Sequence, residues 1–349
     1  MIHDFFLTEW FFYVLRWLYG VFGNSYFLTI LAVTLVLRLV QIFPDIQSRK
    51  TQKKQAEIQP QIDKLKEKYS NDPQKLNQEQ NKLMRENGIG CLSGCLPMLL
   101  TLPLFFCFLA AFRFWGYEQT VKLTYETIVN ETRAEQTYES FRFGWITNIW
   151  QPDSGLAPVV TPAKTVAAYG SNQSLFACFK KQDTTTSKIG NLVILHDGYT
   201  DFDGNFVSGE EIWRTFTESG LAKGEYGTEQ MLLLSDEASQ QKYDELMQVY
   251  KKGYNNGWFI LPILAAAFQF LLAWFSQKQQ KKANPAASAQ QNMNFMMYLF
   301  PIMSIVFCMT STSAFALYWV LSSVLQIGSS TLINYLMNKK EKPAEIVQK

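Results

Sequence analysis

Histidine and cysteine are scarce in this sequence, which limits the metal and redox chemistry available to it. Its 349 residues include two histidines and five cysteines. Cys91 and Cys95 have a spacing seen among zinc ligands, but no second pair follows, so a zinc site is not expected. Cys107 and Cys308 lie in apolar runs, where a thiol packs as a small apolar group, and no disulfide framework is indicated.

The motifs of common enzyme classes are missing as well. No glycine-rich phosphate loop precedes a predicted helix, and no candidate nucleophile has an identifiable base. The apolar runs lack the metal-ligand or carboxylate clusters of an intramembrane protease. The sequence therefore predicts a protein that is not an enzyme and that uses no cofactor or metal.

What the sequence does contain is a set of long apolar runs. The mean hydropathy is only -0.07 because these runs alternate with charged segments. A helix needs about 20 apolar residues to cross roughly 30 Å of hydrocarbon. Five runs have about this length, and they cover residues 25–43, 96–115, 258–275, 293–310 and 314–336. The predicted fold class is an all-α integral membrane protein with five transmembrane helices.

The charged segments differ in sign, which predicts the orientation of these helices. Segments 45–90, 276–292 and 337–349 each carry more Lys and Arg than Asp and Glu. Segment 116–257 instead has nineteen acidic and twelve basic residues. Lys and Arg are retained on the cytoplasmic side of short loops. The N-terminus is therefore expected on the outer side of the cell membrane and the C-terminus in the cytoplasm.

The aromatic N-terminus predicts a helix that lies in the membrane interface. It carries Asp4, Glu9 and Arg16 among its rings, and it lacks the basic start and small-residue cleavage site of a signal peptide. The alternative, a span over 5–22, would move only the N-terminus to the other side. The predicted segments are the interfacial helix (1–24), a first span (25–44), a cytoplasmic helical hairpin (45–92), a second span (93–115), a large extracytoplasmic loop domain (116–257), a third span (258–276), a cytoplasmic loop (277–292), a fourth span (293–311), a fifth span (312–337) and a cytoplasmic tail (338–349).

The hairpin prediction for 45–92 follows from helical periodicity and a clear break. One apolar stripe on the first arm recurs at i, i+4, i+7 and i+11, at Ile58, Ile62, Leu65 and Tyr69. Asp72 is placed as the N-cap of the second arm, with Pro73 at its first position. A stripe this narrow suits either a solvated helical pair tethered at the membrane or a mobile docking arm.

Arg38 is the most informative residue, since an arginine at the centre of a span costs ~2.5–3.5 kcal/mol on insertion scales. It shares one helical face with other polar residues, namely Thr34, Gln41 and Asp45. The last span carries a comparable stripe at Tyr318, Ser322, Gln326 and Ser329, and Gln269 interrupts the third span. These faces predict a hydrophilic groove among the spans. The alternative is that Arg38 only extends to the inner headgroups.

Residues 155–250 have the composition of a small globular domain. Leu192–Leu195, followed by Asp197-Gly198, predicts a strand, and Asn205–Val207 predicts another after the turn residues Asp203-Gly204. The acidic residues of this turn partly fit a calcium loop, but its first ligand position would be Tyr199. A β-turn is the favoured interpretation.

Short motifs recur in the same order over roughly two-thirds of the sequence. They start at Thr34-Leu-Val-Leu-Arg38, continue through the basic hairpin and include Gly94-Cys95-Leu96-Pro97-Met98. Further motifs are Phe143-Gly144-Trp145-Ile146 with Pro152-Asp153, Phe300-Pro301-Ile302-Met303, and Ala316-Leu317-Tyr318-Trp319. Together they resemble the YidC/Oxa1/Alb3 membrane protein insertase family, in its Gram-positive type. One departure is Thr312-Ser313-Ala314, where the family usually has Pro-Ala-Gly or Pro-Ser-Gly.

The resemblance implies a five-helix bundle around a water-filled groove that is closed to the outside. It implies an insertase and chaperone for nascent membrane proteins, acting alone or with the Sec translocon. Its expected partners are the lipid bilayer, the ribosome and the signal recognition particle pathway, and no nucleic acid is directly required. The implied substrate-groove residues are Thr34, Arg38, Gln41, Gln269, Tyr318, Trp319, Ser322 and Gln326.

Two other functions remain open from the residues alone. A small-anion transporter would use Arg38 as its binding charge, although the sequence shows no repeated halves. A membrane receptor would bind a ligand with its outside segment and signal through the hairpin.

Overall fold

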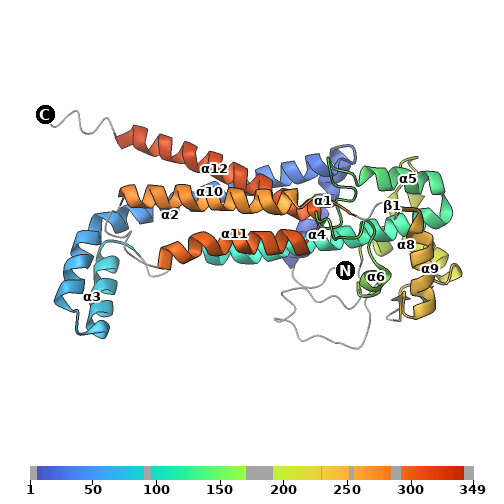
Figure 1. The fold of residues 1–349 in the computed structure, drawn as a ribbon, viewed down its shortest axis with the longest axis horizontal. Coiled ribbons are helices and arrows are strands. Elements are labelled where there is room, and N and C mark those ends of the chain that lie inside the picture. Colours follow the sequence, from blue (N-terminus) through green and yellow to red (C-terminus); the bar gives the residue numbers. More distant parts are fainter. Residues whose placement is uncertain are drawn as a thin grey trace. The chain divides into compact units, whose positions relative to one another are not determined.

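The protein is predominantly α-helical over the residues that its structure, a computed structural model, describes: 6–89, 96–169, 192–228, 230–250, 255–283 and 292–341. Figure 1 shows the order of the elements. The long helices are α1 (Phe6–Val21), α2 (Tyr26–Lys68), α3 (Pro73–Glu86), α4 (Leu96–Val129), α10 (Ile260–Ala283), α11 (Asn292–Thr310) and α12 (Ser313–Glu341). The shorter elements are α5 (Glu131–Ser140), α6 (Ala163–Ala167), α7 (Ile194–Asp197), β1 (Tyr199–Thr200), β2 (Phe206–Val207), α8 (Gly209–Glu218), β3 (Ala222–Lys223), β4 (Leu232–Leu233), α9 (Glu237–Met247) and the 3-10 helix η3 (Gln248–Tyr250).

Among the residues that the structure describes, three helices are long and apolar enough to cross a membrane. These candidate spans are Tyr26–Thr51 in α2, Ile260–Lys278 in α10 and Ser313–Leu336 in α12, and a shorter apolar helix covers Tyr298–Thr310 in α11. With the predominance of helix, they agree with an all-α integral membrane protein. The count of five spans stays a prediction; residues 96–115 of the second predicted span lie within α4.

The chain divides into two compact units. Unit 1 comprises Met1–Ala32, Leu104–Ile263 and Val306–Tyr318, and unit 2 comprises Val33–Pro103, Leu264–Ile305 and Trp319–Lys349. Unit 1 has a core of large aromatic side chains, including the fully buried Trp115, Trp213 and Tyr243. Unit 2 holds most of the polar residues that the sequence places in the spans.

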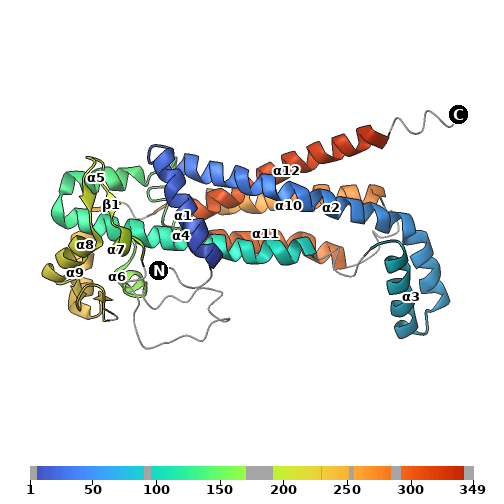
Figure 2. The same ribbon diagram turned by 180° about the vertical axis from the view of Figure 1, so that it is seen from behind.

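Within unit 2, α3 and the end of α2 form a helical hairpin, seen from both sides in Figures 1 and 2. The predicted cap is confirmed: the Asp72 carboxylate accepts a hydrogen bond from the Lys75 backbone N–H at 3.1 Å, and Pro73 is the first residue of α3. Ile58, Ile62 and Ile89 form a small buried cluster, against which Leu83 and Met84 pack. The hairpin therefore has a core of its own.

Helix α2 does not end at Pro44, where the first span was predicted to end. It continues through Pro44 and Pro60 as far as Lys68. Each proline removes one N–H donor from the helix, which nevertheless continues past both positions. The predicted span and the first arm of the hairpin are thus one helix.

Helix α4 continues fourteen residues beyond the apolar run that ends at 115. Glu118, Lys122 and Glu126 lie four residues apart on one face of this extension, and all three are buried. Because other parts of unit 1 cover this charged face, the helix persists where the hydropathy pattern predicted the start of a loop domain.

The prediction of a strand at Leu192–Leu195 is wrong. Residues 194–197 form the short helix α7, and its buried Ile194 backbone N–H donates to a Glu118 carboxylate oxygen at 2.8 Å. Gly198, with φ 62°, ends the helix and leads into β1. The second predicted strand is present in part as β2, which pairs antiparallel with β1.

Candidate functional site: the buried arginine of α2

Arg38 lies on α2 with a side chain that is only 6 % exposed to solvent. Its Nε donates to Ser329 Oγ on α12 at 2.8 Å, and its Nη1 donates to Gln41 Oε1 at 3.3 Å. Its Nη2 forms an ion pair with Asp45, one further turn along the same face. The guanidinium is thus enclosed by protein groups, whereas an arginine that only extended to headgroups would have an exposed tip.

The residues of the predicted polar face of α2 lie on one continuous helix, and they are not equally accessible. Thr34 is 1 % exposed, while Gln41 and Asp45 are half-buried. The face also continues one turn further than predicted, because Arg49 donates to the Asn334 side chain of α12. Two hydrogen bonds between polar side chains therefore connect α2 to α12.

A second set of polar contacts joins α10, α11 and α12. Gln269 Nε2 donates to Ser323 Oγ at 3.1 Å, and Ser323 Oγ donates to the Trp319 carbonyl at 2.8 Å. The Trp319 indole N–H donates to Ser304 Oγ on α11 at 3.2 Å. Gln269 thus meets the last helix at Ser323, one residue from the predicted Ser322.

The other predicted residues of α12 are placed differently from one another. Ser322 and Gln326 are half-buried in unit 2, and they share a helical face with Ser329. Tyr318 belongs to unit 1, where its ring centroid lies 4.5 Å from that of Phe108. It also packs on Phe112 and Phe315. The structure places Arg38 with Gln41, and Gln269 with the Trp319 turn, while Tyr318 lies in an aromatic cluster.

The motif around Trp145 and Asp153 is built around a buried carboxylate. Asp153 is fully buried and accepts hydrogen bonds from the backbone N–H groups of Trp258, Phe259 and Leu261 at 2.8, 3.1 and 2.6 Å. Its Oδ2 also accepts from the Trp145 indole N–H at 3.1 Å. Because the free N–H groups at a helix start carry partial positive charge, Asp153 stabilises the beginning of α10.

Asn256 and Ser313 connect the same motif to both flanking helices. The Asn256 amide nitrogen donates to the carbonyls of Asn148, Gln151 and Pro152. Ser313, the first residue of α12, donates to the Gln151 carbonyl through its Oγ at 2.6 Å and its backbone N–H at 3.0 Å. This serine fixes the turn at which the sequence departs from the family pattern.

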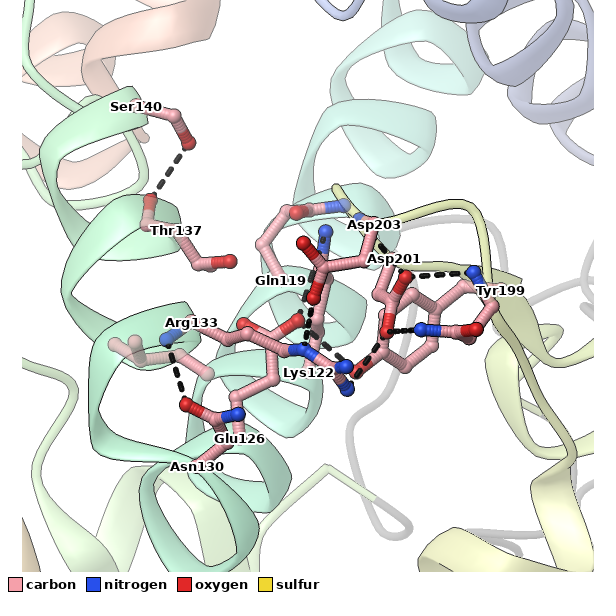
Figure 3. Close-up of polar contacts among 12 residues, drawn as sticks. Gln119, Lys122, Glu126, Asn130, Arg133, Thr137, Ser140, Tyr199, Asp201 and Asp203 are labelled. Atoms are coloured by element: carbon pink, nitrogen blue, oxygen red, sulfur yellow. Dashed lines mark hydrogen bonds and ion pairs between the residues drawn. The ribbon is translucent and has the colours of Figure 1, made fainter.

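The carboxylates of the acidic turn after β1 form hydrogen bonds and ion pairs with other groups of the protein. Asp201 accepts from the backbone N–H groups of Asp203 and Asn205, which confirms the predicted turn. Arg133 pairs with both Asp201 and Asp203 at 2.7 Å, as Figure 3 shows. Burial alone would raise the pKa of the Asp201 carboxyl, but the Asn205 hydrogen bonds and the Arg133 charge hold it below the usual value.

Among the described residues, no group of three His, Cys, Asp or Glu could hold a metal ion. Cys91 and Cys95 lie outside the described residues.

Several contacts of the site were not predicted from the sequence. Ser304, Ser323 and Asn334 each receive a hydrogen bond from a polar side chain on another helix. Extending the α2 stripe by one turn would have found Arg49, whereas Asn334 follows Ser329 by five residues and lies off the predicted stripe of α12. Nothing local distinguishes Ser323 from Ser322, because neighbouring residues on a helix differ by about 100° and the facing surface depends on packing.

Comparison with known proteins identifies the family. The family model for the 60Kd inner membrane protein matches residues 17–195 and 219–341. Among similar curated proteins, the membrane protein insertase YidC of Clostridium perfringens is 34% identical over 149 residues, which are 42% of this chain and 54% of that protein. That of Rickettsia typhi is 31% identical over 164 residues, 45% of this chain and 26% of that protein. That of Jannaschia sp. is 35% identical over 151 residues, 43% of this chain and 21% of that protein.

These alignments span about half the length of the Clostridium perfringens protein and about a quarter or less of the other two. The family model, in contrast, matches most of this chain, including the helix that carries Arg38 and the last helix. The chain belongs to the 60Kd inner membrane protein family.

Proposed function

We propose that the chain is a membrane protein insertase, which accepts hydrophobic segments of nascent proteins and releases them sideways into the bilayer. The observation that carries this proposal is the enclosed Arg38, held by Asp45, Gln41 and Ser329 between two apolar helices. The names of the relatives support it, as does the family membership. A buried cation of this kind is costly, and it is kept where it serves a function.

The proposed substrate groove is lined by the polar residues of α2, α10 and α12. Its residues in unit 2 are Thr34, Arg38, Gln41, Gln269, Trp319, Ser322 and Gln326. Tyr318 stays a predicted groove residue and lies in the aromatic cluster of unit 1. A substrate carboxylate would replace Asp45 as the partner of Arg38, since an arginine binds one carboxylate as well as another of equal geometry. The apolar part of the substrate then moves into lipid, which contributes ~25 cal/mol per Å² of apolar area removed from water.

No covalent step is needed for this mechanism, because the transfer of apolar surface into lipid supplies the free energy. The proposed location is the bacterial cell membrane, with the N-terminus outside and the C-terminus in the cytoplasm. The hairpin of α2 and α3 faces the cytoplasm in this arrangement. Its basic residues are suited to contact ribosomes, targeting factors or the Sec translocon, each of which is a proposed partner.

Purified protein in liposomes tests the function directly. A small coat-like substrate with an acidic tail and one hydrophobic segment should become protected from external protease only in vesicles that contain the protein. The same vesicles should not pass small anions. Anion flux without substrate insertion would instead identify a transporter, and failure of both assays with a folded protein would favour a receptor.

A further inference from the structure

A cavity of about 320 Å³ lies in unit 1, at the ends of the apolar helices. Its wall combines residues of α4, of the segment 150–169, and of the turn between α11 and α12. Arg113 and Tyr117 contribute from α4, and Thr310 and Thr312 from the turn. The volume is at the lower end of the range for small-ligand sites, which is ~300–1,000 Å³. Nothing in the insertase mechanism uses this cavity.

The lining of the cavity suits an anion. Over the part of the chain that the structure describes, fifteen residues line it, and they include one cation, Arg113, and no carboxylate. This is unexpected in a region of the sequence where acidic residues outnumber basic ones. A planar guanidinium presents several N–H donors to the oxygens of a phosphate, and its charge strengthens each hydrogen bond.

Hydroxyl groups and the Gln151 side-chain amide form much of the rest of the polar wall, and hydrogen bonds hold them in place. Gln151 Nε2 donates to Thr161 Oγ1 at 2.7 Å, and Thr161 Oγ1 lies 3.2 Å from Thr120 Oγ1. Arg113 Nη2 donates to the Tyr117 hydroxyl at 3.1 Å, and the Tyr117 ring stacks on Tyr169 with centroids 4.0 Å apart. The wall is therefore ordered before any ligand arrives, which lowers the entropic cost of binding.

The position of the cavity points to an amphiphile. Thr310 ends the apolar helix Tyr298–Thr310, and Ser313 begins the next candidate span, so the cavity lies where helices leave the hydrocarbon. Val306 is one turn before Thr310 on the same face and is 55% exposed, and Met309 is 40% exposed. A ligand with its polar end at Thr310 would have apolar surface beside it.

We propose that this cavity binds the phosphate headgroup of an anionic phospholipid, with the acyl chains along the exposed apolar face of α11. Arg113 binds the phosphate, and the hydroxyl groups of the wall bind its ester oxygens or the glycerol. The site is separate from the proposed groove and does not depend on insertase activity. A bound lipid would fix the turn between α11 and α12 at the membrane surface.

Native mass spectrometry of the full chain in detergent tests this site, with phosphatidylglycerol and phosphatidylcholine as the two probes. We expect the wild type to retain phosphatidylglycerol more tightly than phosphatidylcholine. Arg113→Gln should weaken phosphatidylglycerol binding by about tenfold, equal to about 1.4 kcal/mol. Arg142→Gln, a control at an exposed arginine outside the cavity, should leave it unchanged. Equal binding by the wild type and Arg113→Gln would overturn the proposal.

Thr165, an exposed residue of α6 in the cavity wall, allows a second test that does not remove the arginine. Thr165→Trp should fill the cavity and reduce phosphatidylglycerol binding, while the midpoint of thermal unfolding stays within about 2 °C of the wild type. A photocrosslinker at Thr165 should capture lipid. Capture of a nascent substrate instead, or competition by inorganic phosphate at the same concentration as the lipid, would contradict a lipid site.

Discussion

At the scale of single residues, the charge and the direction of Arg38 are the features that insertion should depend on. Arg38→Ala should reduce insertion of substrates with acidic tails by at least about tenfold, because it removes an attraction between opposite charges in a poorly solvated site. Substrates with neutral tails should be spared. Arg38→Lys should retain activity. The readout is protease protection of radiolabelled substrate at equal membrane abundance of each variant.

A positional control separates the groove from a simple interfacial charge. Leu39 is 68% exposed and lies about 100° around the helix from Arg38, at nearly the same depth. The double variant Arg38→Leu, Leu39→Arg keeps the charge but directs it away from Ser329. It should fail with acidic-tail substrates. Normal insertion by this variant would leave Arg38 as an interface anchor only.

Glu118 is the residue whose ionisation should affect the stability of unit 1. It lies on α4 beyond the candidate spans, and burial raises the pKa of its carboxyl to about 7, although the Arg16 charge and the hydrogen bond from Ile194 act in the opposite direction. The nearby Asp197 adds to the rise. Since the folded state holds this proton more tightly than the unfolded chain does, stability is lost as pH rises from about 4.5 to about 7.

The size of this effect follows from the difference between the two pKa values. About 2.5 pKa units correspond to roughly 3 kcal/mol in the free energy of unfolding. Glu118→Gln should remove this part of the pH dependence of the thermal unfolding midpoint in detergent, and Glu135→Gln, at an exposed position, should not. The Glu126 pKa is also raised by burial, so only the difference between wild type and Glu118→Gln isolates Glu118. If the unfolding midpoints of the wild type and Glu118→Gln changed with pH in parallel, Glu118 would not be the source of this pH dependence.

At the scale of elements, the hairpin should behave as a small folding unit. Ile58→Ala removes a side chain that is 4% exposed in its core, and a buried Ile→Ala change typically costs about 2–5 kcal/mol. Such a loss should speed amide hydrogen exchange in α3 while α10 and α12 stay protected. Glu57→Ala, at the exposed neighbouring position, is the control. Loss of protection in α12 as well would make the hairpin part of a larger cooperative unit.

The elements that the sequence predicts well are those determined by local interactions. Asp72 and Pro73 specify the start of α3 through a contact over three residues, and the structure has this cap. The polar face of α2 likewise follows from helical spacing alone. The strand expected at Leu192–Leu195 is wrong because its backbone is held by Glu118, 76 positions away in the sequence. A single sequence carries no signal for such a contact.

The same distinction applies to the candidate site. Arg38 and Gln41 are found together because they share a helix, and Ser329 could be named because it continues a stripe. Asp153 and Asn256 could not be paired with their partners, which lie about a hundred residues away. Gly257 shows the same limit: a Cβ there would lie 2.0 Å from Asp153 Oδ1, so its role is visible only in three dimensions.

At the scale of the whole molecule, the charge distribution predicts on which side of the membrane each polar segment lies. Glu135 is an exposed residue of the acidic segment 116–257, and Lys82 is an exposed residue of the basic hairpin. In a chain whose five native cysteines are replaced by serine, a single cysteine is introduced as Glu135→Cys or Lys82→Cys. Both sites are exposed in the structure, so a difference in labelling reports the side of the membrane and not burial by protein.

A membrane-impermeant maleimide applied to intact cells should label Glu135→Cys at once and Lys82→Cys only after lysis. The physical reason is that Lys and Arg near short loops resist transfer across the membrane, whereas acidic residues oppose it little. The ratio of labelling before and after lysis is the measurement, and each variant must still insert substrate. Labelling of Lys82→Cys in intact cells would reverse the topology, and the hairpin would then be unable to meet ribosomes or other cytoplasmic partners.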